Sequence, residues 1–204
     1  MSFSLSCYGS AKTGNGIDTD QVVSAAGAST LAYDGVEWVG RYIEALTPAE
    51  IQNIHNAGMK VVLLFSKFTG TYWYSNQEPS PCGTGNCLAT SGTLNWTSAN
   101  GASDATYALS LVANLGVSPS PNIVVYNDID ECQSIASSSM TGQIVSDAVA
   151  YLSAWGAGLS QGGWGVGVYS HSTDLTVLHN NSATIKGWPF GTISLSPQGG
   201  EAIT

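Results

Sequence analysis

One segment in the first third of the chain is apolar without a break. Residues 61–65 read Val-Val-Leu-Leu-Phe and follow Lys60. Successive side chains of a strand point to opposite faces, so this strand is expected to be buried on both sides. Such strands are typical of a parallel sheet with both of its faces covered, and the segment therefore favours an α/β fold.

Strand-like and helix-like segments alternate along the rest of the chain. The clearest helix start is Thr47-Pro48-Ala49-Glu50, in which Thr47 can cap, Pro48 suits the first turn and Glu50 completes a capping box. Gly58 is expected to end this helix in a left-handed conformation. Further strands are predicted at 16–18, 37–43, 122–126 and 165–169, and further helices at 21–28, 103–115, 139–155 and 171–179. This alternation predicts a parallel sheet with helices between its strands.

The length of 204 residues suits one domain, residues 1–204. A complete (β/α)₈ barrel typically needs about 250 residues, and the region 187–204 has little helical pattern. The expected fold is therefore a TIM-type barrel of parallel strands that is incomplete or divergent at its C-terminus. A smaller open sheet is the alternative.

The charge balance restricts the possible partners. The chain has five Lys and Arg residues against fourteen Asp and Glu, a net charge of −9. So few cations cannot neutralise many phosphates, which argues against nucleic-acid binding, and a neutral polysaccharide fits better. No apolar run is long enough for a membrane span. The surface chemistry, poor in Lys and rich in Ser, Thr, Asn and Gly, favours a secreted or cell-surface protein, although residues 1–16 do not resemble a signal peptide.

The sequence predicts no cofactor and no metal. No glycine-rich nucleotide or phosphate motif follows any expected strand. The cysteine spacing is not that of a zinc site. Cys82 and Cys87 flank the turn-forming Gly-Thr-Gly-Asn and are predicted to form a disulfide; Cys7 and Cys132 are either a second pair or free buried thiols.

Acidic residues follow the predicted strand at 122–126. Asp128 and Asp130 are two positions apart, so both side chains are expected on one face of the strand end. Two close carboxylates in a partly dry site acquire different pKa values, which supplies one acid and one base for glycoside hydrolysis. Glu131 joins them if the strand has ended. The alternative is a solvated acidic turn.

Three other groups of residues are candidates for the same site. Asp18 ends the first strand and is either a member of the rim or a turn residue. Arg41 lies in a strand expected to be buried, and it either braces the acidic cluster or forms a structural ion pair. Aromatic residues of the long segment 66–100 either stack on sugar rings or form a small core of their own: Tyr72, Trp73, Tyr74 and Trp96. Glu131, Arg41 and Tyr169, the last at the end of the 165–169 strand, are substrate-binding candidates together with these aromatic residues.

The order of several short motifs resembles a known family. These are Ile17-Asp18, Val39-Gly40-Arg41-Tyr42-Ile43, Leu46-Thr47-x-x-Glu50, Ala57-Gly58, Gly101-x-x-Asp104-Ala105, Leu115-Gly116, the run from Ile123 to Asp130, and the run from Gly165 to Ser170. Together they are similar to the glycoside-hydrolase-like barrel domain of unknown function, a relative of the family 25 muramidases. The resemblance covers residues 16 to about 170.

The resemblance implies an exported TIM-type barrel that acts on or near cell-wall glycan, with peptidoglycan as the favoured substrate. By position, Asp18 resembles the first-strand aspartate of the muramidases and Asp128 the first carboxylate of their D-x-E pair. Asp130 stands in the place of the glutamate, and its side chain is one methylene shorter. The C-terminal strands of the family, with their usual Trp residues, are not recognisable after Trp188.

Two functions follow from this sequence. The first is a glycoside hydrolase that uses paired carboxylates at the barrel mouth. The second is a non-catalytic carbohydrate-binding module on a hydrolase-derived barrel. Convergence of Asp128 and Asp130 on one open cleft, with a perturbed carboxyl group, would favour the hydrolase, and an exposed, unperturbed pair would favour the binding module.

Overall fold

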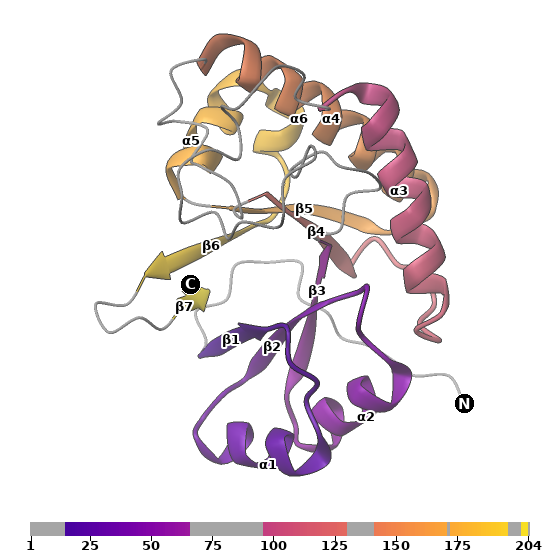
Figure 1. The fold of residues 1–204 in the computed structure, drawn as a ribbon, viewed down its shortest axis with the longest axis vertical. Helices are drawn as coiled ribbons and strands as arrows, with labels where there is room; N and C mark the ends of the chain where they lie inside the picture. The colour runs from indigo at the N-terminus through magenta and orange to yellow at the C-terminus, as the bar shows by residue number, and fades with distance from the viewer. Residues whose placement is uncertain (1–14, 66–95, 130–140, 171, 196–200, 204) are drawn as a thin grey trace, which may run out of the picture.

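The computed structural model describes residues 15–65, 96–129, 141–170, 172–195 and 201–203. Strands and helices alternate through most of this part of the chain (Figure 1). In order, the elements are β1 (Gly16–Thr19), α1 (Ala25–Tyr33), β2 (Trp38–Tyr42), α2 (Pro48–Asn56), β3 (Lys60–Phe65), α3 (Ser98–Ala113), β4 (Val124–Asp128), α4 (Thr141–Gln161), β5 (Gly165–Ser170), α5 (Ser172–Asn181), α6 (Ala183–Lys186), β6 (Phe190–Leu195) and β7 (Glu201–Ile203).

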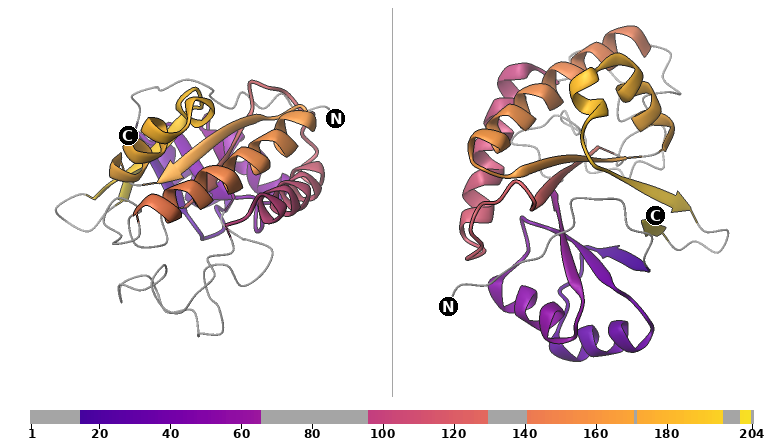
Figure 2. Two further views of the ribbon diagram at one scale, coloured as in Figure 1. Left: turned by 90° about the horizontal axis from the view of Figure 1, so that it is seen from above. Right: turned by 180° about the vertical axis from the view of Figure 1, so that it is seen from behind.

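The strands form one sheet in the order of the sequence. Each neighbouring pair from β1 to β6 is parallel, and β7 pairs antiparallel with β6. Figures 1 and 2 show α1 and α2 outside β1–β3, and α3 to α6 outside β4–β6, while β7 comes beside β1. The predicted α/β TIM-type fold is therefore confirmed. The sheet departs from the regular repeat after β6, because β7 runs in the opposite direction.

The helix predicted from its capping residues forms as expected. The Thr47 hydroxyl oxygen accepts a hydrogen bond from the Glu50 backbone N–H at 3.2 Å, which satisfies one of the free donors of the first turn of α2. Gly58 follows the helix with φ of 83°, a conformation that side chains disfavour. Only half of the capping box is present, because the Glu50 carboxylate bonds Arg41 and the Val23 backbone instead.

Two helices begin four or five residues away from where they were predicted. Helix α1 starts at Ala25 rather than at 21, because the Ser24 side chain caps it by accepting from the Gly27 N–H. Helix α3 starts at Ser98 rather than at 103, capped by Thr97. Gly101, which as a helix breaker obscured this start, lies against α4: a Cβ there would come 2.1 Å from the Tyr151 carbonyl oxygen. Its lack of a side chain lets the two helices pack closely.

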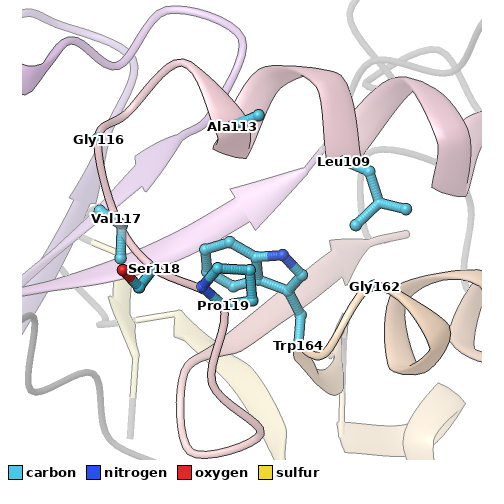
Figure 3. A pocket seen from close by; sticks show the side chains of 8 residues that line it. All are labelled: Leu109, Ala113, Gly116, Val117, Ser118, Pro119, Gly162 and Trp164. Atoms are coloured by element: carbon cyan, nitrogen blue, oxygen red, sulfur yellow. The ribbon is translucent and has the colours of Figure 1, made fainter.

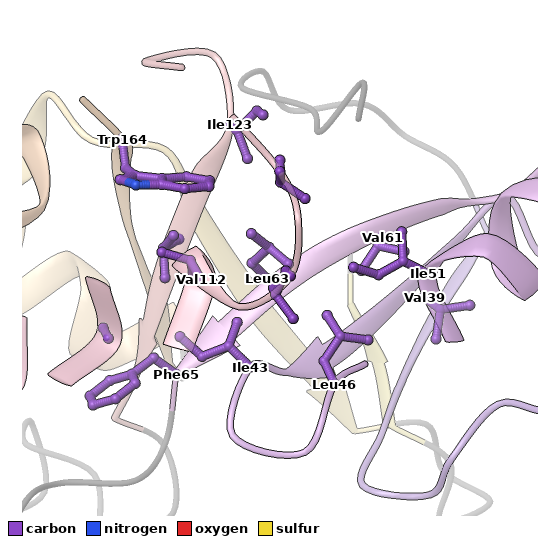
Figure 4. Packing of buried hydrophobic residues seen from close by; sticks show 14 of the residues in the cluster. Val39, Ile43, Leu46, Ile51, Val61, Leu63, Phe65, Val112, Ile123 and Trp164 are labelled. Atoms are coloured by element: carbon purple, nitrogen blue, oxygen red, sulfur yellow. The ribbon is translucent and has the colours of Figure 1, made fainter. Parts of the chain in front are cut away.

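Alternate residues of the strands from β2 to β5 face opposite sides of the sheet. The outward residues pack against the helices, and Figure 4 shows Val39, Val61 and Leu63 of this layer among side chains of α2 and α3. The inward residues form a smaller cluster of Leu64, Val124, Tyr126 and Tyr169, with Tyr42 and Val62 packed against it. Because side chains alternate along a strand, the position of a residue decides whether it packs against the helices or lines the inner face.

Candidate functional site

Two aspartates have the inward parity. Asp18 is the third residue of β1, and Asp128 is the last residue of β4, where the chain leaves the carboxyl end of the sheet. Asp18 is half-buried, and Asp128 is completely buried. Asp18 is the register partner of Gly40, and Asp128 is the register partner of Tyr169. These neighbours of the two carboxylates therefore also face the inner side of the sheet. In TIM-type barrels this end of the sheet contains the active site.

A tyrosine from another strand bonds each carboxylate. The Tyr42 hydroxyl of β2 donates to Asp128 Oδ2 at 2.9 Å. The Tyr169 hydroxyl of β5 donates to Asp18 Oδ2 at 3.2 Å. Neither bond joins adjacent strands, because β3 lies between β2 and β4, and β5 is separated from β1 in the sheet order. The two bonds therefore cross the inner face and hold both carboxylates in fixed positions.

The environment of Asp18 favours its protonated form. Burial raises the pKa of the Asp18 carboxyl above its ordinary value, and hydrogen bonds from the Tyr169 hydroxyl and from the Asp18 backbone oppose this increase. Desolvation disfavours the charged carboxylate, whereas a donated hydrogen bond stabilises it. Asp18 therefore holds its proton to higher pH than an aspartate in water does, in a site that still reaches solvent.

Arg41 has the opposite parity from its neighbour Tyr42 and faces the helices. Its side chain is 0% exposed, and its Nε donates to Glu50 Oε1 at 2.5 Å. One terminal nitrogen of the guanidinium also donates to the Thr19 carbonyl oxygen. Of the two interpretations of Arg41, the structure shows the structural ion pair: the guanidinium is bonded on the outer side of the sheet and does not brace Asp128.

A second buried network lies behind Asp128, on the helix side of β4. The Tyr151 hydroxyl donates to Asp104 Oδ2 at 2.8 Å, and Asn127 Nδ2 donates to the Tyr151 hydroxyl oxygen at 3.4 Å. All three side chains are completely buried. This network attaches the end of β4 to α3 and α4, and thereby fixes the backbone that presents Asp128.

The sequence prediction missed Tyr42. The sequence pattern contains a signal for this residue. In a strand at 37–43, Tyr42 lies two positions after Gly40, so both face the same side of the sheet as the first-strand aspartate Asp18. Asp104, which is in one of the recognised motifs, had no assigned role. Its partner Tyr151 lies in the helix predicted at 139–155, and only the fold shows that its hydroxyl meets a carboxylate.

The other predicted site residues divide into two groups. Tyr169 is 1% exposed and has a carboxylate partner in Asp18, and Trp96 is 3% exposed. The Trp96 ring stacks on Tyr151, with 6.4 Å between centroids and 22° between planes, so it is a core residue rather than an open platform for a sugar. The remaining residues lie outside the described part of the chain: Asp130, Glu131, Tyr72, Trp73, Tyr74 and the four cysteines.

The pocket in Figure 3 is not near the carboxylates. It has a volume of about 450 Å³, and its lining includes Val117, Pro119, Gly162 and Trp164. These residues precede β4 and β5, so the pocket lies at the amino end of the sheet, opposite the end where Asp128 sits. A second pocket of about 390 Å³ lies between β1 and α1 and includes Thr19 and Val22.

Two further features concern ligands and membranes. Within the described ranges, no group of three or more His, Cys, Asp or Glu side chains is arranged to hold a metal ion. No helix in that same part of the protein combines the length and the apolar character that crossing a membrane requires.

Comparison with known proteins gives one family and a fold. A family model described as the Rv2525c-like, glycoside hydrolase-like domain matches residues 29–191. A solved xylose isomerase-like TIM barrel/4-hydroxyphenylpyruvate dioxygenase fusion protein is 14% identical with a TM-score of 0.50, over 89% of this chain and 26% of that one. A sugar phosphate isomerase/epimerase from Parabacteroides distasonis is 12% identical with a TM-score of 0.42, over 80% of this chain and 54% of the other.

The chain thus spans about a quarter and about half of these two structures. At such low identity, the likeness to the first of them supports the TIM-barrel fold alone. No curated protein sequence matches the chain significantly.

Proposed function

Because the chain belongs to the family of Rv2525c-like, glycoside hydrolase-like domains, we propose that it hydrolyses a β-linked polysaccharide, with cell-wall peptidoglycan as the favoured substrate. A relation to the family 25 muramidases, carried by the motifs around Asp18 and Asp128, is part of this proposal. Because the substrate lies outside the cell, the protein would be secreted or held at the cell surface.

The arrangement of Asp18 and Asp128 is the observation that carries the proposal. Both side chains are on the inward rows, each accepts a tyrosine hydroxyl, and Asp18 has a raised pKa. Glycoside hydrolysis uses two carboxyl groups of different character, one protonated and one ionised. The half-buried Asp18 is the proton donor in this proposal, and Asp128, which accepts the Tyr42 hydroxyl, is the second carboxyl group of the pair.

The proposed reaction balances without a cofactor. The Asp18 proton moves to the glycosidic oxygen, which leaves with the electron pair of its bond to the anomeric carbon. The negative charge of Asp128 stabilises the oxocarbenium-like centre, and a carboxylate in a dry site is effective in this role. Water then bonds to the anomeric carbon and returns a proton to Asp18.

Carboxamide variants test the proposal. Asp18→Asn and Asp128→Asn remove one acidic group each at nearly constant shape, and each is expected to lower the turnover of peptidoglycan by about 10²- to 10⁴-fold. Release of reducing ends measures the turnover, and circular dichroism checks the fold. The control is Asp34→Asn, an exposed aspartate after α1 near the amino end of the sheet. Hydrolysis by Asp18→Asn at the wild-type rate would refute the assigned role of Asp18.

The full burial of Asp128 favours a second candidate, a carbohydrate-binding domain without turnover. In that case the Tyr42–Asp128 bond serves to order the inner face, and no bond of the glycan is broken. Calorimetric binding of soluble glycan fragments, with no reducing ends released over long incubation, would identify this function.

A further inference from the structure

Tyr169 connects the two carboxylates of the inner face. Its Cα is the register partner of Asp128 across β4 and β5, so its side chain starts next to that aspartate. Its hydroxyl ends on Asp18 Oδ2, on another strand. The ring is 1% exposed and packs in the inward cluster, which gives the phenol little freedom to move.

Tyr42 makes the reciprocal connection. It is two positions after Gly40, the register partner of Asp18, and its hydroxyl bonds Asp128. Gly40 leaves the space that this arrangement needs, because a Cβ at that position would come within 3.0 Å of the Asp18 Cβ. Each carboxylate is therefore bonded by the tyrosine that starts beside the other carboxylate.

From this crossing we propose that Tyr169 is a positioning residue that fixes the rotation of the Asp18 carboxyl group, so that Oδ2 accepts the phenol and Oδ1 holds the transferable proton. The inference rests on the proposed hydrolase function of Asp18. The Tyr169 hydroxyl is a fixed donor to Oδ2, and the Asp18 backbone also bonds the carboxyl group, so the phenol and the backbone together restrain its rotation. General acid catalysis depends on this placement as much as on the pKa of the acid.

Among the charged and titratable groups described near the inner face, Tyr169 is the one suited to restrain the Asp18 carboxyl group. The described inward rows contain Asp128 and Tyr126 on β4 and Tyr42 on β2, while Lys60 has the same parity at the opposite, amino end of β3. The guanidinium of Arg41 is on the outer face, bonded to Glu50. Tyr169 is the side chain with a described hydrogen bond to the Asp18 carboxyl group.

The variant Tyr169→Phe removes the hydroxyl and keeps the ring. Without the donated bond, the ionised form of Asp18 loses a stabilising contact, so the pKa of Asp18 is expected to rise further. Carbon-detected nuclear magnetic resonance of the labelled carboxyl group measures this titration directly, and the signal is assigned by its absence in Asp18→Asn. In hydrolysis, kcat is expected to fall about 10- to 100-fold with little change in KM. The alkaline limb of the pH profile is expected to move to higher pH.

Two further variants make the test specific. Tyr107→Phe is the matched control, since Tyr107 is on α3 and its ring packs edge-on against Phe65, away from the inner face. It should leave both the titration and the hydrolysis unchanged. Site-specific 3-fluorotyrosine at 169 keeps the hydroxyl and makes it a stronger donor, so it should lower the pKa of Asp18. This variant also decides the question if Tyr169→Phe fails to fold.

The outcomes separate the inference from the proposed function. An unchanged Asp18 titration in Tyr169→Phe, or no effect of the fluorinated tyrosine, overturns the positioning role even if the wild-type protein hydrolyses glycan. A shifted titration in a protein without any hydrolysis supports the link between Tyr169 and Asp18 but refutes the hydrolase. A loss of kcat with an unshifted pH profile would indicate that the hydroxyl is only structural.

Discussion

The ion pair between Arg41 and Glu50 gives the most quantitative prediction. Both side chains are almost completely buried, and the Glu50 carboxylate accepts from Arg41 Nε at 2.5 Å and from the Val23 N–H at 2.9 Å. The variant Glu50→Gln keeps an acceptor for Val23 but leaves the guanidinium as an uncompensated buried charge. Breaking a buried pair in this way costs about 3–5 kcal/mol of the free energy of unfolding. For a domain of this size the expected decrease in Tm is about 6–20 °C.

A second substitution tests whether the unpaired charge is the cause. In Arg41→Met/Glu50→Gln both charges of the pair are gone, so the double variant is expected to be more stable than Glu50→Gln alone. Urea unfolding followed by circular dichroism gives the free energies, and Glu37→Gln, an exposed carboxylate before β2, is the control. The reasoning would be refuted if Glu50→Gln lost less than about 1 kcal/mol of the free energy of unfolding. It would also be refuted if the loss in the double variant equalled the sum of the losses in Glu50→Gln and Arg41→Met.

Three further predictions concern the inner face and the cysteines. Asp18→Asn should stabilise the fold at neutral pH by about 0.5–1 kcal/mol. A carboxyl group whose pKa is higher in the folded than in the unfolded protein lowers the free energy of unfolding as the pH rises from the unfolded pKa through the folded pKa. Thermal melts should therefore show the gain disappear below about pH 4. Tyr42→Phe should cost about 1.5–3 kcal/mol in urea unfolding, because it removes a donor from the buried Asp128 carboxylate. Mass mapping under non-reducing conditions should find Cys82 bonded to Cys87, with a stabilisation of about 2–3 kcal/mol; free thiols there would contradict the prediction.

The parts of the fold that the sequence predicted are those specified by local chemistry. The strand at 60–65 is recognisable because its burial on both faces leaves no polar residue after Lys60. Helix α2 is predicted from Thr47 and Gly58, whose roles depend only on backbone geometry. Strands β6 and β7 were not predicted, because a short strand acquires its register from a neighbour, as β6 does from β5. Such pairing is tertiary information that a local pattern does not contain.

The candidate site was predictable to the same extent. The positions of Asp18 on β1 and Asp128 at the end of β4 follow from the sequence pattern, whereas Asp130, the predicted partner of Asp128, lies outside the described residues. The partners that distinguish them do not follow, because Tyr42 and Tyr169 meet carboxylates of strands that are not their neighbours. Which strands face each other across the inner side depends on how the sheet curls, and this is a property of the whole fold.

The short run from Gly40 to Tyr42 shows how one strand serves both the fold and the site. Gly40 and Tyr42 face inward, where the first gives space to Asp18 and the second bonds Asp128. Arg41 faces outward and bonds both Glu50 of α2 and the backbone carbonyl of Thr19, the residue after Asp18. The outer ion pair therefore holds the end of β1 in place although it touches neither carboxylate. Its contribution to the site is mechanical rather than electrostatic, because the Arg41 charge is balanced by Glu50 on the far side of the sheet.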